Sequence, residues 1–383
     1  MANNTQTQGG TSRYSPFTNK LRLDGENTTR AFSGEHNILL QRIQVLEIIA
    51  GAASEQQRNQ SARGDIVAAE SSNQNHPFSG RNKLFVFGDS YADTGNTNTT
   101  DKGAWAYPYS ITYPGKPSGR FSDGHISTDF LAQLLRIKLP VTYKKKDDVD
   151  KIRLQYGMSF AYGGTGVFDT KVKYPNMTGQ INLFEQLLGN VYSPSDLSSS
   201  VALVSVAGND YINFLNTTRS FKEIMQFIED VVKQTEVNLR RIHTLGVKKI
   251  AIPSLSPLQD IPYFANTSLP FHDIIQPAVK YLVKYHNDLL QKIVAKLNNE
   301  NNHSAFTIID YYNTFLTVFN NKGEIPGILQ LNVSKPCLDN GGTLCDDPRS
   351  FFFWDAIHPT QEGWKSVYKV LRNNITAALM PKA

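Results

Sequence analysis

The stretch KLFVFGDSYADTGN, residues 83–96, places Ser90 directly after a short apolar run and the pair Gly88 and Asp89. Asp and Ser are preferred N-cap residues and Gly permits a turn, so Ser90 could cap a helix that follows a strand. The alternative is that Ser90 is a nucleophile, because the working groups of open α/β sheets lie beyond the carboxyl ends of the strands. Residues elsewhere in the chain have to distinguish the two interpretations.

Short apolar runs alternate with long amphipathic stretches from residue 83 onward. Runs suited to strands buried on both faces are LFVF, VALVSVAG, KKIAIPS and AFTIID, at residues 84–87, 201–208, 248–254 and 305–310. Apolar residues recur at helical spacing in residues 126–137, 181–192, 221–246 and 274–299. This order of strands and helices predicts a doubly wound, mostly parallel sheet covered on both faces.

The composition separates an N-terminal extension from a globular body. Residues 1–80 are rich in Asn, Gln, Ser, Thr and Gly, and they carry too little apolar surface to offset the entropy of ordering. We expect most of them to be disordered. The chain of 383 residues is 40% apolar and 11% aromatic, which is ample for a sizeable core. We expect one catalytic domain over residues 83–382.

One segment of the extension, NILLQRIQVLEIIAGAAS at residues 37–54, is apolar. Its small final residues are typical of a signal-peptide cleavage region, but Glu47 interrupts the run, which begins far from Met1. Because Gln41, Gln44 and Glu47 fall three residues apart, the pattern favours an amphipathic helix. A degraded leader ahead of a downstream start is the remaining alternative.

The charge pattern argues against several classes of protein. The formal net charge of +5 is spread thinly, and the basic run at residues 144–146 is followed by Asp147, Asp148 and Asp150. Such a run indicates a solvated loop, and no base-reading motif occurs, so we expect no nucleic-acid partner. No run reaches the roughly 18 apolar residues of a membrane span, so we expect no transmembrane segment.

The two cysteines, Cys337 and Cys345, lie in KPCLDNGGTLC, where Asp-Asn-Gly-Gly allows the chain to turn back. A local disulfide is one interpretation, and two free thiols in a cytosolic protein are the other. Zinc is not expected, because no second pair or His-x-x-x-His spacing accompanies them. Asn-x-Ser/Thr sequons favour the secretory pathway. Through the body of the chain they occur at Asn98, Asn176, Asn216, Asn266, Asn302, Asn332 and Asn374.

A nucleophilic serine needs a histidine base and a carboxylate that orients it. Four histidines have no catalytic signature around them, and we expect them to have surface or packing roles. They are His243, His272, His286 and His303. His358 differs, because in FFFWDAIHPTQEGW it follows Asp355 by three residues and directly precedes Pro359. Pro at the first helical position predicts a helix that begins here. Asp355 then either holds the imidazole in the tautomer that accepts a serine proton or is a chance neighbour of a helix cap.

Four segments together resemble a known family. FVFGDSYADTGN, YGMSFAYGGTGVFD, SVAGNDY and FWDAIHPT resemble, in order, the consensus blocks of the plant GDSL esterase/lipases of the SGNH hydrolase superfamily. KPSGRFSDGHISTDFLAQ also resembles the stretch that follows the first block. The resemblance spans about residues 83–382. It implies a three-layer α/β/α flavodoxin-like fold with a mostly parallel sheet, and an esterase that uses no cofactor.

The resemblance also implies a catalytic set. In the family the first-block serine is the nucleophile, which is Ser90 here, and the last block supplies the base His358 and the orienting carboxylate Asp355. Ser159 stands where the family commonly has Asn, which puts none of these roles in doubt.

An oxyanion hole is implied by the same blocks. Its donors would be the backbone N–H of Ser90, the backbone N–H of Gly164, with Gly163 as the neighbouring alternative, and the side-chain amide of Asn209. Glycine suits its position because a bare backbone approaches a substrate oxygen closely. A neutral amide stabilises developing negative charge without pairing permanently with an acid.

Asp89 and Asp93 flank Ser90 and invite a metal interpretation. We expect Asp89 instead to accept backbone N–H groups in the turn and to fix the serine, so no metal is expected.

We therefore predict a serine hydrolase of carboxylic esters that acts on small-molecule or lipid esters, or on acylated polysaccharides. An acyltransferase or carbohydrate deacetylase with the same triad is the nearest alternative. A silent binding protein on this fold is another, and a nucleotide-binding module fails because GGTG lacks the phosphate-loop spacing. The family resemblance, the sequons and a disulfide favour secretion, although no clean signal peptide begins at Met1.

Overall fold

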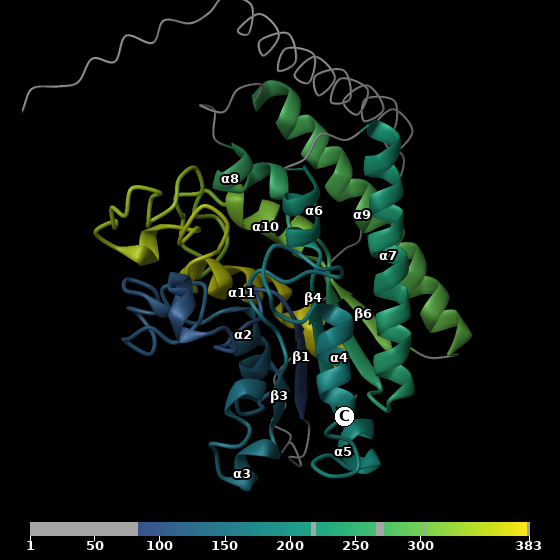
Figure 1. Cartoon of the computed structure of the whole chain (residues 1–383). Coiled ribbons are helices and arrows are strands. Elements are labelled where there is room, and N and C mark those ends of the chain that lie inside the picture. The colour runs from purple at the N-terminus through teal and green to yellow at the C-terminus, as the bar shows by residue number, and fades with distance from the viewer. Residues whose placement is uncertain (1–82, 216–219, 266–271, 302–303, 381–383) are drawn as a thin grey trace, which may run out of the picture. The chain divides into compact units, whose positions relative to one another are not determined.

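The computed structural model describes residues 83–215, 220–265, 272–301 and 304–380 (Figure 1). The disorder expected for residues 1–80 and the helix expected at 37–54 lie outside the described residues, so both stay predictions. Within the described ranges, no helix combines the length and the apolar character that a bilayer crossing requires.

A six-stranded sheet forms the centre of the domain, and all of its strand pairs are parallel. Its strands are β1 (Leu84–Gly88), β2 (Val141–Thr142), β3 (Gly157–Ser159), β4 (Val201–Ser205), β5 (Lys249–Pro253) and β6 (Phe306–Ile309). They are ordered β2-β3-β1-β4-β5-β6. The predicted parallel α/β architecture is confirmed. β4, β5 and β6 lie within their apolar runs, and β1 extends one residue beyond its run.

Burial on both faces explains why these runs are continuously apolar. In β1, Leu84 and Val86 belong to one buried cluster, whereas Phe85 and Phe87 belong to another. Successive side chains of a strand point to opposite faces, so each cluster lies between the sheet and one layer of helices.

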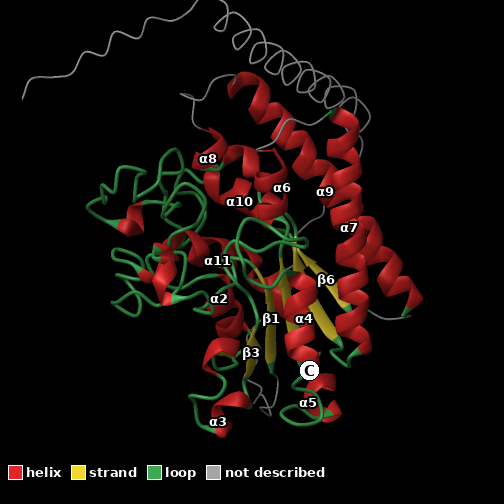
Figure 2. Cartoon of the chain, in the orientation of Figure 1, coloured by secondary structure: helices red, strands yellow, loops and turns green. Residues whose placement is uncertain are grey.

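Helices cover both faces of the sheet, as Figure 2 shows. One face packs against α2 (Ser127–Leu134), α10 (Tyr311–Phe319) and α11 (Gln361–Leu379). The other packs against α4 (Met177–Glu185) and the C-terminal halves of α7 (Phe221–Thr244) and α9 (His272–Glu300). Shorter helices are α3 (Lys151–Leu154), α5 (Pro194–Ser198), α6 (Gly208–Leu215) and α8 (Pro262–Ala265).

Local capping sets where several helices begin and end. In α7, the Ser220 hydroxyl accepts from Glu223 N–H while the Glu223 carboxylate accepts from Ser220 N–H, and Gly246 follows the last turn with φ +122°. The helix predicted to start at Pro359 starts instead at Gln361, because Thr360 is the N-cap and Pro359 bridges to Phe353. The helix predicted at 181–192 is α4, which lies further toward the N-terminus.

The strand order places one crevice at the carboxyl ends of the sheet. Without the edge strand β2, the order is that of flavodoxin-like folds, in which the chain reverses direction beside the first strand. Ligands of such sheets bind where the order reverses, which here lies between β1 and β4. Ser90 follows β1 and Asn209 follows β4, so both lie at this position.

Candidate active site

Ser90 lies in a tight turn rather than at a helix start. The backbone N–H groups of Ala92 and Asp93 donate to the carbonyl of Asp89 at 3.0 and 2.9 Å, which closes the turn directly after β1. The Ser90 side chain is buried, and its Oγ lies 2.8 Å from Nε2 of His358. The capping interpretation of Ser90 is therefore wrong.

Asp355 contacts the opposite edge of the same imidazole. Nδ1 of His358 lies 2.8 Å from each Asp355 carboxylate oxygen, and Oδ1 also accepts the backbone N–H groups of Ile357 and His358 at 2.9 and 2.8 Å. Burial would raise the pKa of the Asp355 carboxyl, but the His358 charge and these hydrogen bonds outweigh it, so the pKa lies below its ordinary value. Asp355 is thus an anion that fixes the orientation of His358.

The segment that contains the two cysteines is hydrogen-bonded to the loop that carries Asp355 and His358. Cys337 and Cys345 form a disulfide. The N–H of Cys337 donates to the carbonyl of Phe353 at 2.9 Å, and the N–H of Leu338 donates to the carbonyl of Trp354 at 2.7 Å. The disulfide-closed loop therefore holds the chain just before Asp355.

Two tyrosines that the sequence did not indicate also hold this loop. The Tyr109 hydroxyl donates to Oδ2 of Asp355 at 2.8 Å, and its ring packs against Trp354 with centroids 5.8 Å apart. The Tyr91 hydroxyl donates to the carbonyl of Ile357 at 2.9 Å. No local pattern marks either role, because the partners lie 246 and 266 residues away along the chain.

The predicted oxyanion donors differ in whether their hydrogens are already bonded, and Asn209 lines the same cavity as Ser90. Gly163 N–H is committed to Oδ2 of Asp93 at 3.0 Å, whereas Gly164 N–H and Ser90 N–H donate to no acceptor among the described residues. Gly164 has φ +81°, a conformation that favours glycine. The Asn209 amide donates one hydrogen to the carbonyl of Thr165 at 2.9 Å, which leaves its second hydrogen available.

A strained turn and a buried carboxylate position Asn209. Ala207, between β4 and α6, has φ +97°, which costs energy for a residue with a Cβ and is typical of functional sites. The next turn begins α6 at Gly208, so Asn209 projects from a helix start. Asp210 accepts the N–H groups of Val167 and Phe168, each at 2.9 Å, and so joins the loops after β3 and β4.

Three buried aspartates near Ser90 accept backbone N–H groups, as expected for Asp89. Asp89 accepts Tyr91 N–H at 3.0 Å, and Asp93 accepts Gly95 N–H at 2.7 Å. Burial raises the pKa of Asp89 to about 7 and that of Asp93 to about 6, against the lowering effect of these hydrogen bonds. Burial likewise raises the pKa of Asp210 to about 6. Among the described residues, no group of three or more His, Cys, Asp and Glu is arranged to hold a metal ion.

A small cavity opens beside Ser90. Its volume is about 40 Å³, and its lining includes Asn209, Leu255, Tyr311 and Ile357. By the space that a buried water occupies, it holds roughly three or four water molecules.

Of the other candidate histidines, the two whose side chains are described contact residues other than Ser90. His286 is buried and bonds the Tyr211 hydroxyl at 2.6 Å, and burial lowers its pKa to about 3. His243 packs its ring against Phe306, at 5.3 Å between centroids. The side chain of His272 and all of His303 lie outside what the structure describes.

Comparisons with known proteins agree with this arrangement. The sequence model of the family "GDSL-like Lipase/Acylhydrolase" matches residues 84–371, which include Ser90, Asn209, Asp355 and His358. The chain is 54% identical over 340 residues to GDSL esterase/lipase At5g03610 of Arabidopsis thaliana, covering 83% of this chain and 94% of the relative. It is 50% identical over 316 residues to GDSL esterase/lipase At3g09930 of the same plant, covering 77% and 89%. Acetylajmalan esterase 2 of Rauvolfia serpentina is 27% identical over 333 residues, covering 77% and 91%.

Proposed function

This chain belongs to the GDSL-like lipase/acylhydrolase family and is a carboxylic ester hydrolase, and we propose that it works through an acyl-enzyme on Ser90. The resemblance of its sequence blocks to the plant GDSL esterase/lipases is confirmed. The observation that carries the mechanism is the continuous hydrogen-bonded chain from Ser90 through His358 to Asp355, with 2.8 Å at each step.

Acylation begins with proton transfer from Ser90 Oγ to Nε2 of His358. Oγ attacks the ester carbon, and the charge that develops on the carbonyl oxygen is stabilised by the N–H groups of Ser90 and Gly164 and by the Asn209 amide. His358 then protonates the departing alcohol as the bond from the acyl carbon to the alkoxy oxygen breaks. Asp355 stays ionised throughout and stabilises the imidazolium, which agrees with its lowered pKa.

Deacylation repeats these steps with water. His358 removes a proton from water, the oxygen adds to the acyl carbon, and the bond to Ser90 breaks as its Oγ recovers the proton. The carboxylic acid leaves and the enzyme is restored. No residue other than this set is required for the proton balance.

The small cavity beside Ser90 supports a short acyl group. A volume of about 40 Å³ suits an acetyl or similarly short chain, and its apolar walls at Leu255 and Ile357 would receive the methyl end. The printed name of one relative, acetylajmalan esterase 2, also denotes action on an acetyl ester. We therefore place this chain among esterases of short-chain esters rather than among long-chain lipases.

The test is a series of p-nitrophenyl esters from acetate to palmitate with wild-type protein and Ser90→Ala. We expect kcat/KM to fall at least tenfold between butyrate and octanoate, and Ser90→Ala to lose all measurable turnover. The matched control is Ser198→Ala, which alters an exposed serine of α5. Preference for palmitate would refute the short-chain proposal alone, whereas turnover by Ser90→Ala would refute the mechanism.

We also propose that the enzyme is secreted. The Cys337–Cys345 disulfide supports this, because disulfides persist in oxidising compartments. Asn98 and Asn374 are exposed sequon residues that glycosyltransferases could reach. Treatment of the protein from its native source with a glycosidase should lower its mass, and an unchanged mass with free thiols at both cysteines would contradict secretion.

A further inference from the structure

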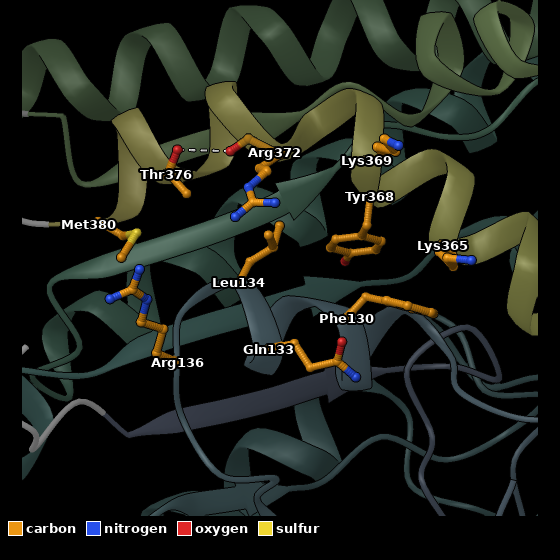
Figure 3. A pocket seen from close by; sticks show the side chains of 10 residues that line it. All are labelled: Phe130, Gln133, Leu134, Arg136, Lys365, Tyr368, Lys369, Arg372, Thr376 and Met380. Carbon is orange, nitrogen blue, oxygen red and sulfur yellow. Dashed lines mark hydrogen bonds between the residues drawn. The ribbon is translucent and has the colours of Figure 1, made fainter. Parts of the chain in front are cut away.

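A second, larger cavity lies between α2 and α11, lined by residues other than those of the catalytic loops. This groove has a volume of about 550 Å³, within the range of small-molecule sites. Figure 3 shows its side chains, which come from α2 and the residues just after it on one side and from α11 and Met380 on the other. Nothing in the ester hydrolysis described above uses these residues.

Cations dominate the polar lining of the groove. Lys365, Lys369 and Arg372 are spaced four and three residues apart and so share one face of α11, while Arg136 lies across from them just after α2. Like charges at this helical spacing destabilise a helix. None of the ten lining residues is acidic.

Three of these four cations form no ion pair with a carboxylate of the described residues. Lys365 pairs with Glu362 at 3.0 Å, and the Lys369 ammonium extends toward Gly327, where an added Cβ would meet it. Arg136 and Arg372 form no ion pair with any described residue, and both guanidinium groups lie toward the Met380 end of the groove in Figure 3. The C-terminal dipole of α2 can favour Arg136, but Arg372 lies in the middle of α11, where no dipole favours it.

Besides the polar Gln133 and Thr376, the remaining lining side chains are apolar or aromatic. Phe130 and Tyr368 stack with centroids 5.9 Å apart and planes 24° apart, and Leu134 and Met380 complete the apolar lining. A free inorganic anion would leave these apolar side chains exposed to water, whereas a ligand with an alkyl chain would cover them.

We propose that this groove binds a single-chain carboxylate amphiphile, such as a fatty acid. Arg136 and Arg372 bind the carboxylate, because guanidinium groups match carboxylate oxygens in geometry and charge. The alkyl chain lies along Leu134 and Phe130, whose side chains are partly exposed. This site is separate from the acyl-enzyme site and goes beyond the proposed ester hydrolysis.

The test measures dodecanoate binding by titration calorimetry, below its micelle concentration, on protein whose Ser90 has first been blocked with a fluorophosphonate. Blocking removes product binding at the catalytic serine from the signal. We expect saturable one-to-one binding that weakens at least tenfold in Arg136→Gln/Arg372→Gln. The matched control is Lys233→Gln/Lys292→Gln, which removes two exposed lysines of α7 and α9 and should leave the affinity unchanged.

Dodecanol serves as the uncharged ligand of equal length and should bind at least tenfold more weakly than dodecanoate. Unchanged dodecanoate affinity in the double arginine variant would overturn the proposal, as would equal binding of dodecanol. Because both arginines are exposed, the variant should keep its turnover of p-nitrophenyl acetate when left unblocked, which verifies its fold. Arg136→Lys/Arg372→Lys keeps the charge and should bind with intermediate affinity.

Discussion

Nε2 of His358 lies 2.8 Å from Oγ of Ser90, although 268 residues separate them in the chain. The contact forms because β1 is central in the sheet and the loop before α11 returns over its carboxyl end. His358 is therefore within hydrogen-bond reach of Ser90 before any substrate binds. Its orientation depends on Asp355 and on the residues that hold Asp355.

Tyr109→Phe should lower kcat by on the order of tenfold with little change in KM. The hydroxyl donates to Oδ2 of Asp355 at 2.8 Å, so its loss loosens the carboxylate that positions His358. The carboxylate, relieved of one donor, also stabilises the protonated imidazole more strongly. The acidic limb of the kcat/KM profile should therefore move to higher pH, which a pH-rate series measures.

Tyr107→Phe is the control for this prediction, because Tyr107 is 76% exposed and lies two residues away. It should leave both kcat and the profile unchanged. An equal loss in the two variants, or a fall in kcat for Tyr109→Phe without movement of the acidic limb, would show a role in folding rather than in positioning.

Asn209→Ala should reduce kcat by about 10² to 10³, the usual cost of removing one oxyanion donor. The side chain makes only one described hydrogen bond through its amide, to Thr165, so the fold should survive its loss. Steady-state kinetics measure the effect beside Asn373→Ala, an exposed amide of α11. A purely KM effect would mean that Asn209 binds substrate and transition state alike.

Asp89→Asn should flatten the dependence of stability on pH. Burial raises the pKa of Asp89 to about 7, above its ordinary value of 3.8. The contribution of neutral Asp89 to the free energy of unfolding is therefore fully present below about pH 4 and is lost as pH rises through about 7. This group should remove on the order of 2 kcal/mol of unfolding free energy between pH 5 and 8. Asn keeps the oxygen that accepts Tyr91 N–H but cannot ionise.

Urea unfolding at pH 5 and pH 8 measures this difference in both proteins. Asp150→Asn, at an exposed aspartate, should retain the wild-type dependence. An equally steep dependence in Asp89→Asn would show that Asp89 is ionised in the folded protein across this range.

Hydrophobic periodicity predicts the long helices and strands of this fold but not the short strands. The apolar runs predict β1, β4, β5 and β6 because each of these strands is buried on both faces. β2 and β3 have two and three residues, too few for any pattern to form. The start of α11 was placed two residues early, because Pro359 is engaged by Phe353 in a bridge that only the folded chain creates.

The candidate site likewise contains residues that the sequence indicates and residues that it does not. Ser90, Asn209, Asp355 and His358 stand within short blocks whose order and spacing are visible in the sequence. The choice between Gly163 and Gly164 depends on which N–H is free, and Asp93 occupies that of Gly163 from 70 residues away. The sequence does not indicate Tyr109 for the same reason, because its hydroxyl bonds Asp355, which lies 246 residues away in the chain.

The most direct test of the central claim is peptide mapping by mass spectrometry after treatment with a fluorophosphonate, which reacts only with an activated serine. The account predicts one adduct per molecule, on Ser90, and slower labelling of Tyr109→Phe than of wild type. Well-folded wild-type protein that takes up no label, or that carries the adduct on another serine, would contradict the assignment of Ser90 as the nucleophile.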